Sequence, residues 1–173
     1  MTIQQINTSR IAQLHPSLRQ KATQLIKLCA QAGFSVLITQ GLRTWAEQEA
    51  LYAQGRVSLA QVNAMRKKAG QSPIAAKENR VVTQAPAGSS WHNFGLAFDI
   101  VVLDALGKAD WNSGHPQWKK AGQLGTSIGL VWGGNFRRFK DLPHFELTGN
   151  LKLAEARALF AKGGLPEVWK RIA

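Results

Sequence analysis

Hydrophobic residues recur at helical spacing early in the chain and form short continuous runs further on. Between residues 16 and 32 the apolar positions repeat about every 3.6 residues, at Leu18, Ala22, Leu25, Ile26 and Cys29. This spacing predicts an amphipathic helix that ends at Gly33. The run Val36-Leu37-Ile38 follows, and it predicts a short buried strand over 35–39.

Two capping boxes predict the next two helices, one over 45–54 and one from 58 to about residue 69. In such a box a hydroxyl and a Glu or Gln three residues later satisfy the free amides of a helix start. The boxes are formed by Thr44 with Glu47 and by Ser58 with Gln61. Residues 70–80 contain Gly, Pro and Lys, so we expect an exposed excursion there.

The clearest predicted strand spans residues 97–103, where alternate residues face opposite sides. Phe98, Ile100 and Val102 share one side, and Asp99 lies on the other. Further along, the pattern predicts a helix over 116–128, a short strand over 145–147 and a helix over 151–162. Strands separated by helices of unequal length, with turns around Gly133-Gly134, favour an α+β fold with a small antiparallel sheet. We expect one domain over 1–173, since no repeat or linker divides the chain.

Charge narrows the classes of partner. The formal net charge is +12, and eleven of these units lie in residues 1–30, 61–90 and 151–173. An excess of this kind indicates an anionic partner, such as nucleic acid, a membrane surface or a cell-wall polymer. We expect no nucleic-acid partner, because the basic and aromatic residues form no recognised binding motif.

Other composition features exclude several classes of protein. The single cysteine, Cys29, excludes an internal disulfide and a cysteine-based zinc cluster. No apolar run approaches the roughly 20 residues that span a bilayer. The first residues show no charged segment followed by an apolar one, so we expect no signal peptide and synthesis in the cytoplasm.

Asp99 is out of place in its predicted strand, because every other residue from 97 to 103 is apolar. A buried carboxylate costs several kcal/mol unless it is paired or binds a metal. His92 lies seven residues earlier, and Gly95 lets the chain turn back toward the strand. His144 belongs to a second short strand. Two histidines and a carboxylate form a common catalytic zinc set with an open fourth position.

Spacing alone leaves simpler interpretations open. Asp99 could cap a turn or pair with an arginine, and His92 could be an ordinary loop residue. His15 and His115 each precede proline at a predicted helix start, where a structural role fits best. For most of the tryptophans we expect places in the core or in cleft walls, and we place Trp91, next to His92, in the cleft. These residues are Trp45, Trp91, Trp118, Trp132 and Trp169.

Three blocks of sequence resemble the peptidase M15 family, which includes zinc D,D-carboxypeptidases and L-alanyl-D-glutamate endopeptidases of bacterial cell walls. The first signature stands here as Ser90, His92, Gly95, Ala97 and Asp99. The second stands as Trp132-Gly133-Gly134 followed by Asp141, Pro143, His144, Phe145 and Glu146. An upstream block, residues 40–56 with Arg43 and Gln48, is typical of the endopeptidase branch, which includes many phage endolysins. Residues 57–80 depart from the shortest members and could reshape one wall of the cleft.

The resemblance implies a zinc fold like that of hedgehog and the D,D-peptidases, and a role for each matching residue. His92, Asp99 and His144 correspond to the zinc ligands. Asp141 corresponds to the general base, and Arg43 to the residue that stabilises the oxyanion or holds the substrate. We add Ser90, Gln48 and Trp91 to Arg43 as candidate substrate-binding residues.

The leading functional hypothesis is a zinc peptidase that hydrolyses the L-Ala–D-Glu bond of the peptidoglycan stem peptide. One alternative is a D-Ala-D-Ala carboxypeptidase on the same site. Another, from a different class, is a non-catalytic zinc domain that binds the cell wall. We expect a monomer whose basic surface attracts anionic envelope polymers, with no separate wall-binding module.

Delivery to the wall follows from the expected lack of a signal peptide. We expect an endolysin that stays in the host cytoplasm until a holin releases it to the periplasm and cell wall. Residues 151–173 could engage an anionic membrane, although packing on their own domain is the favoured interpretation.

Overall fold

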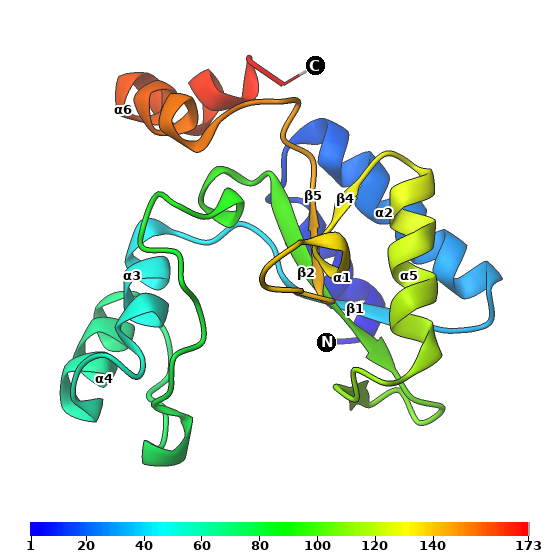
Figure 1. Ribbon diagram of the computed structural model, residues 1–173, viewed down its shortest axis with the longest axis horizontal. Coiled ribbons are helices and arrows are strands. Elements are labelled where there is room, and N and C mark those ends of the chain that lie inside the picture. The colour runs from blue at the N-terminus through cyan, green and yellow to red at the C-terminus, as the bar shows by residue number, and fades with distance from the viewer. Residues whose placement is uncertain (173) are drawn as a thin grey trace.

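The computed structural model describes residues 1–172 and has an α+β architecture, in which helices surround a small antiparallel sheet (Figure 1). The helices are α1 (Ile3–Ile11), α2 (Pro16–Gln31), α3 (Trp45–Ala53), α4 (Leu59–Lys68), α5 (Pro116–Ser127) and α6 (Leu153–Trp169). The strands are β1 (Val36–Gln40), β2 (Ala97–Leu103), β3 (Ala109–Asp110), β4 (Val131–Trp132) and β5 (His144–Glu146). Short 3-10 turns occur at η1 (Ala76–Glu78), η2 (Trp91–Phe94) and η3 (Gly133–Asn135).

The long strand β2 organises the sheet, whose order is β1-β2-β5-β4, with β3 also paired to β2. Every pairing is antiparallel. Asp99 on β2 lies opposite Gln40 of β1 on one side and opposite His144 of β5 on the other. The register of the sheet therefore brings His144 of β5 next to Asp99.

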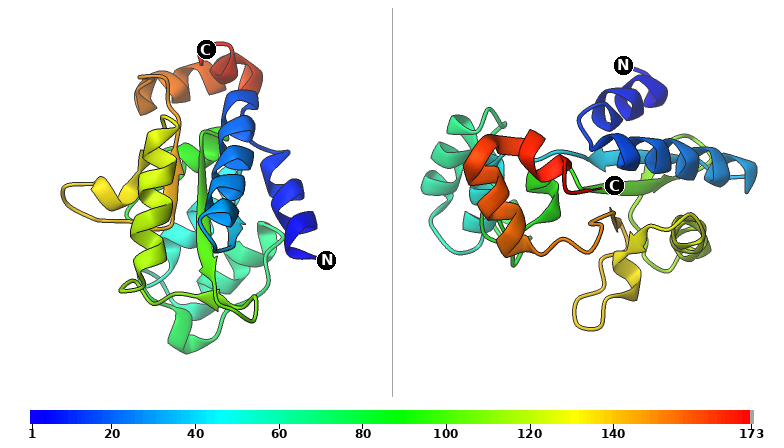
Figure 2. Two further views of the ribbon diagram at one scale, coloured as in Figure 1. Left: turned by 90° about the vertical axis from the view of Figure 1, so that its right-hand side faces the viewer. Right: turned by 90° about the horizontal axis from the view of Figure 1, so that it is seen from above.

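One face of the sheet is covered by α5 and α2, and α1 lies next to α2 along the edge strand β1 (Figure 2). The main core forms between these helices and the strands, and Phe98, Ile100 and Val102 of β2 point into it. This is the side that strand alternation predicted for these three residues. Asp99 faces the opposite way and is left available to the other face of the sheet.

A second hydrophobic cluster holds α6 against η2 and the start of β2. Phe94, Leu96, Leu151, Ala156 and Val168 form its buried centre. The indole Nε1–H of Trp169 donates to the Phe94 carbonyl oxygen at 2.7 Å. Packing of residues 151–172 on their own domain is therefore confirmed, and Ala173 lies outside the described residues. No helix within residues 1–172 combines the length and the apolar character needed to cross a membrane.

Helices α3 and α4 pack together away from the covered face of the sheet (Figure 1). Both predicted capping boxes are present at their starts. The excursion after α4 returns toward α3, where the Asn79 side chain accepts from the Gly55 amide at 2.8 Å. The chain then runs over 80–90 to η2, and residues between 82 and 90 line the active-site hollow. None of residues 57–80 is among the lining residues, so their expected effect on the cleft wall stays a prediction.

Two helices differ from the sequence prediction. The pattern did not predict α1, because its one buried residue is the polar Asn7, which bonds to the backbone of β1 instead of packing as an apolar contact. The pattern ended α6 at residue 162, because Gly163-Gly164 and Pro166 are typical of a helix end. In the structure Gly163 and Gly164 form a kink and helical geometry resumes beyond it.

Candidate metal centre and active site

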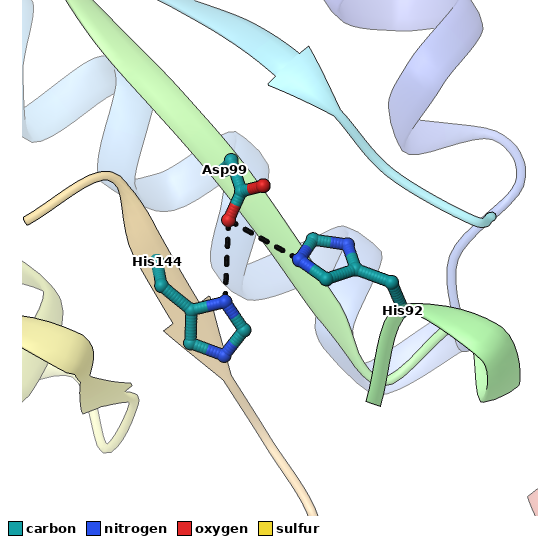
Figure 3. A group of neighbouring side chains, drawn as sticks. All are labelled: His92, Asp99 and His144. Carbon is teal, nitrogen blue, oxygen red and sulfur yellow. Dashed lines mark hydrogen bonds and ion pairs between the residues drawn. The ribbon is translucent and has the colours of Figure 1, made fainter. Parts of the chain in front are cut away.

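The side chains of His92, Asp99 and His144 converge where β2 pairs with β5, and each comes from a different element (Figure 3). Asp99 and His144 are register partners across the β2–β5 pair. His92 comes from η2, which Gly95 ends with a φ of +66°. Only glycine adopts that conformation easily, so the turn that returns His92 toward Asp99 depends on it. The predicted role of Gly95 is confirmed.

The donor atoms of His92, Asp99 and His144 lie close enough together to hold one metal ion. His92 Nε2 and His144 Nδ1 each lie 3.2 Å from Asp99 Oδ1, and all three ligand atoms lie within 4.8 Å of one another. Zinc bound to nitrogen and oxygen at normal distances separates its tetrahedral ligands by about 3.3 Å. The distances from Asp99 Oδ1 to the two histidine nitrogens therefore match those expected around a zinc ion.

The second nitrogen of each histidine is fixed by a hydrogen bond. His92 Nδ1 donates to the Gly41 carbonyl oxygen at 2.9 Å, and His144 Nε2 donates to Glu146 Oε2 at 2.9 Å. With these nitrogens donating, the ring atoms that face Asp99 are His92 Nε2 and His144 Nδ1, and these two atoms would bind a metal ion. Partners of this kind orient a metal-binding imidazole and set its tautomer. Sequence reasoning gave Glu146 no role, although it stands two residues after His144.

The electrostatics keep Asp99 in its metal-binding, ionised form. Burial alone would raise the pKa of Asp99, but the charges and hydrogen bonds of His92 and His144 outweigh it and hold the pKa well below its usual range. Burial alone would lower the pKa of His144, but hydrogen bonds to Asp99 and Glu146 raise it to about 10. Without a metal ion, His144 therefore holds a proton at neutral pH, and a metal ion bound at this site would take the place of that proton.

The donor set opens into a hollow of about 340 Å³. Its walls come from α3, the segment before η2, η2 itself, β2, β5 and the loop that precedes β5. The lining residues that matter below are Arg43, Ser90, Trp91, Asp141 and Glu146. A larger, mostly apolar groove of about 560 Å³ between α1 and α2 is lined by no histidine, cysteine or carboxylate, so the chemistry lies in the smaller hollow.

Asp141 contributes a second carboxylate to this hollow. Its amide donates to the Gly133 carbonyl oxygen at 3.0 Å, and its own carbonyl oxygen accepts from the His144 amide at 3.2 Å. These bonds fix the chain just before His144. Burial of the carboxyl group raises the pKa of Asp141, and the negative charge of Asp99 raises it further. A carboxylate with raised basicity beside a metal site can accept a proton.

Arg43 lies in the connection between β1 and α3, and its side chain lines the same hollow. Its Nη2 lies 3.7 Å from Asp99 Oδ2, so the arginine pairing considered for Asp99 exists together with the histidine contacts. Its Nη1 donates to Gln48 Oε1 at 2.9 Å. Gln48 Nε2 in turn donates to the Ala85 carbonyl oxygen at 2.7 Å.

The other predicted site residues divide into two groups. Ser90 and Trp91 lie in the wall of the hollow, where a substrate could reach them. Gln48 has no exposed surface, so in this structure it touches Arg43 and the chain at Ala85 instead of the open space. Its predicted contact with substrate is therefore not available in this geometry.

The two remaining histidines cap helices, as the sequence indicated. His15 Nδ1 accepts from the Ser17 amide at the start of α2, and His115 Nδ1 accepts from the Gln117 amide at the start of α5. Neither belongs to the metal-ligand group found within residues 1–172.

Comparison with known proteins identifies a relative that matches most of the chain. The chain is 33% identical over 144 residues to the peptidoglycan L-alanyl-D-glutamate endopeptidase CwlK of Bacillus subtilis (strain 168), and the match covers 79% of this chain and 75% of that protein. A family model described as D-alanyl-D-alanine carboxypeptidase matches residues 83–147. This segment contains all three metal-site residues and Asp141.

Two solved structures share the fold at lower identity. One is a mutant of the vancomycin resistance D,D-pentapeptidase VanY in complex with Zn(II), with a TM-score of 0.51, 16% identity and coverage of 90% of this chain and 83% of that one. The other is VanYB in complex with D-alanine-D-alanine, with a TM-score of 0.51, 16% identity and coverage of 91% and 82%. At this identity the likeness supports the α+β architecture alone.

Proposed function

This chain belongs to the peptidase M15 family of metallopeptidases, and from that membership we propose that it hydrolyses the L-Ala–D-Glu bond of the peptidoglycan stem peptide. The observation that carries the proposal is the hollow itself, in which the His92–Asp99–His144 donor set, Asp141 and Arg43 meet. The bond specificity rests on the similarity to CwlK, which spans most of both chains.

His92, Asp99 and His144 would hold a zinc ion, because their donor atoms lie close together and the second nitrogen of each histidine is held by a hydrogen bond. A zinc ion bound there supplies Lewis acidity, which acidifies water and polarises a peptide carbonyl.

Asp141 acts as the proton carrier in this proposal. Its carboxylate oxygen takes a proton from the attacking water and then gives it to the nitrogen of the leaving D-Glu. The bond between the L-Ala carbonyl carbon and that nitrogen breaks, which leaves a carboxylate on L-Ala and an amine on D-Glu. The backbone bonds of Asp141 to Gly133 and His144 hold the carboxylate beside the donor set.

Arg43 orients the substrate carbonyl and stabilises the negative charge that develops on its oxygen. The guanidinium is almost fully buried, and Gln48 holds one of its nitrogens. A fixed donor costs little reorganisation when charge develops. Ser90 and Trp91 form the wall along which the stem peptide lies, and Gln48 serves as a positioning residue.

A second candidate is D-Ala-D-Ala carboxypeptidase activity, which the description of the matching family model favours. It would use the same donor set and the same proton carrier, so the site geometry does not separate the two activities. The separation comes from the products. An endopeptidase creates new D-Glu amino termini, whereas the carboxypeptidase releases free D-Ala.

The test is a digest of purified muropeptides by the zinc-loaded chain, with products identified by mass spectrometry. We expect cleavage between L-Ala and D-Glu, lost on treatment with a chelator and restored by zinc. Asp141→Ala should lower kcat by about 10²- to 10⁴-fold while keeping close to one zinc per chain. Absence of cleavage with zinc bound would instead support the non-catalytic wall-binding domain, and loss of zinc in the variant would make Asp141 a ligand.

A further inference from the structure

A second, smaller hollow adjoins the active site and shares Asp141 with it. It has a volume of about 220 Å³ and lies between the β3–α5 connection and the loop before β5. Its lining consists of Trp111, Ser113, Trp118, Lys140, Asp141, Leu142 and Pro143. Nothing in the hydrolysis described above uses this space.

Trp111 gives the hollow an open aromatic wall. It is 60% exposed, while Trp118 beside it is 2% exposed. The two rings are tilted by 30° with centroids 6.3 Å apart. A single exposed apolar side chain is common on protein surfaces, so exposure alone indicates nothing. A tryptophan held against a second indole and lining a hollow next to an active site is a more specific arrangement.

The rim of the hollow also carries polar groups. Ser113 and Lys140 add a hydroxyl and an ammonium group at exposed positions. Aromatic faces with a few polar groups are typical of sites that bind amphipathic ligands.

A sugar ring matches this combination, because its C–H face packs on an aromatic ring while its hydroxyl and acetamido groups reach polar atoms. We propose that the Trp111 hollow is a carbohydrate subsite that binds the N-acetylated muramic acid to which the stem peptide is attached. This proposal rests on the proposed L-Ala–D-Glu cleavage and specifies the substrate of that same site.

The chemistry of the substrate supports this position. The L-Ala amino group is joined to the lactyl ether of the sugar, so the sugar lies one residue from the scissile bond. The L-Ala and lactyl units together span about 7 Å, and the Trp111 hollow shares the lining residue Asp141 with the active-site hollow. A bond between two D-Ala residues lies at the other end of the stem, several residues from the sugar. A subsite here therefore suits the endopeptidase and not the carboxypeptidase.

The test compares two substrates that differ only in the sugar. One is N-acetylmuramoyl-L-Ala-D-Glu extended by the remaining stem residues, and the other is the same peptide with an acetyl group in place of the muramoyl group. The variants are Trp111→Ala and Trp111→Phe, with Leu106→Ala as the control, because Leu106 is 79% exposed and lines neither hollow.

We expect Trp111→Ala to raise KM for the muramoyl peptide roughly five- to tenfold, as loss of one aromatic contact predicts. kcat, and both constants for the sugar-free peptide, should stay within about twofold of the unmodified chain. Trp111→Phe should keep most of the affinity, and Leu106→Ala should change nothing. Equal effects on the two substrates, or no effect on either, would overturn the carbohydrate subsite.

A binding measurement separates this proposal from the proposed function. N-Acetylmuramoyl-L-alanine, which contains no scissile bond, is titrated into the unmodified chain and Trp111→Ala in a calorimeter. Binding that depends on Trp111 supports the subsite even if neither substrate is cleaved. Absence of binding, or binding that the variant retains, overturns it even if both substrates are cleaved.

Discussion

Gly133 and Asp141 lie so close together that no side chain fits between them. A Cβ atom built on Gly133 would lie 2.4 Å from the Asp141 carbonyl oxygen and 3.0 Å from the His144 Cβ. The first glycine of the Trp-Gly-Gly motif is thus required for space, and it sets the position of Asp141, the proposed proton carrier. Gly134 meets a similar limit against the Trp132 ring.

Gly133→Ala should therefore displace Asp141 and lower kcat by at least about tenfold, since small misplacements of a catalytic group are costly. Overpacking of this kind also destabilises a fold by about 1–3 kcal/mol. Gly114→Ala is the matched control, because its Cβ would meet only the Asn112 side chain, at 3.3 Å. Steady-state kinetics and urea unfolding measure the two effects. Unchanged kcat in Gly133→Ala would show that the motif does not position Asp141.

Glu146 should tune the affinity of the site for zinc through its hydrogen bond to His144. Glu146→Ala is expected to weaken zinc binding by about 10- to 100-fold, with a smaller effect on kcat at saturating zinc. Competition with a fluorescent zinc chelator measures the affinity. Glu155→Ala, which removes a surface ion pair with Arg171, should leave zinc binding unchanged. Equal zinc affinity in both variants would contradict the role of Glu146.

Gln48 should act through Arg43 and not through substrate. Gln48→Leu leaves Arg43 Nη1 and the Ala85 carbonyl oxygen without their partner, which should cost about 1–3 kcal/mol of stability. It should also lower kcat more than it raises KM. In an Arg43→Ala background the same change should reduce kcat little further, because the two residues act as a unit. Additive losses in this double-mutant cycle would show that Gln48 works independently of Arg43.

His15 should make the fold sensitive to mild acid. Burial lowers the pKa of His15, and its Nδ1 accepts a hydrogen bond from Ser17 that protonation would remove. His15 therefore binds a proton more readily in the unfolded chain than in the folded one. Its contribution to the free energy of unfolding is complete above about pH 6.5 and decreases as the pH falls toward the pKa of His15 in the folded chain.

His15→Asn keeps an N-cap acceptor but removes this titration. Its unfolding free energy relative to the unmodified chain should therefore rise as the pH is lowered from 7.5 to 5.5. Urea titrations at the two pH values measure the difference, and His115→Asn controls for loss of a histidine cap as such. If the unfolding free energies of His15→Asn and the unmodified chain differed by the same amount at both pH values, His15 would not be the source of the acid sensitivity.

The sequence predicted the elements that carry a local signal and missed those that depend on tertiary contacts. Capping boxes, apolar periodicity and the strand around Asp99 were enough to place α2, α3, α4, β2 and α5 to within a residue or two. Helix α1 was missed although Thr2 and Gln5 form a capping box, because its contact with the sheet is made by a polar side chain. The continuation of α6 beyond Gly163-Gly164 brings Trp169 to the Phe94 carbonyl oxygen, a contact distant in sequence that no local pattern reveals.

The same division applies to the site. The anomaly of Asp99 and the turn at Gly95 could be read from the chain, so the convergence of His92, Asp99 and His144 was predictable. The burial of Gln48 and the bond between Glu146 and His144 depend on which segments meet in space. The expected monomer and holin-dependent release stay predictions, because neither the fold nor the comparisons bear on them.

The most direct test of the central claim places both candidate bonds in one molecule. An N-acetylated stem pentapeptide, L-Ala-D-Glu through D-Ala-D-Ala, is incubated with the chain carrying one zinc, and the products are followed by mass spectrometry. Asp141→Ala with the same zinc content is the control. We predict cleavage between L-Ala and D-Glu in the unmodified chain, with the terminal D-Ala retained. Release of D-Ala with the L-Ala–D-Glu bond intact, or cleavage of neither bond, would contradict the account.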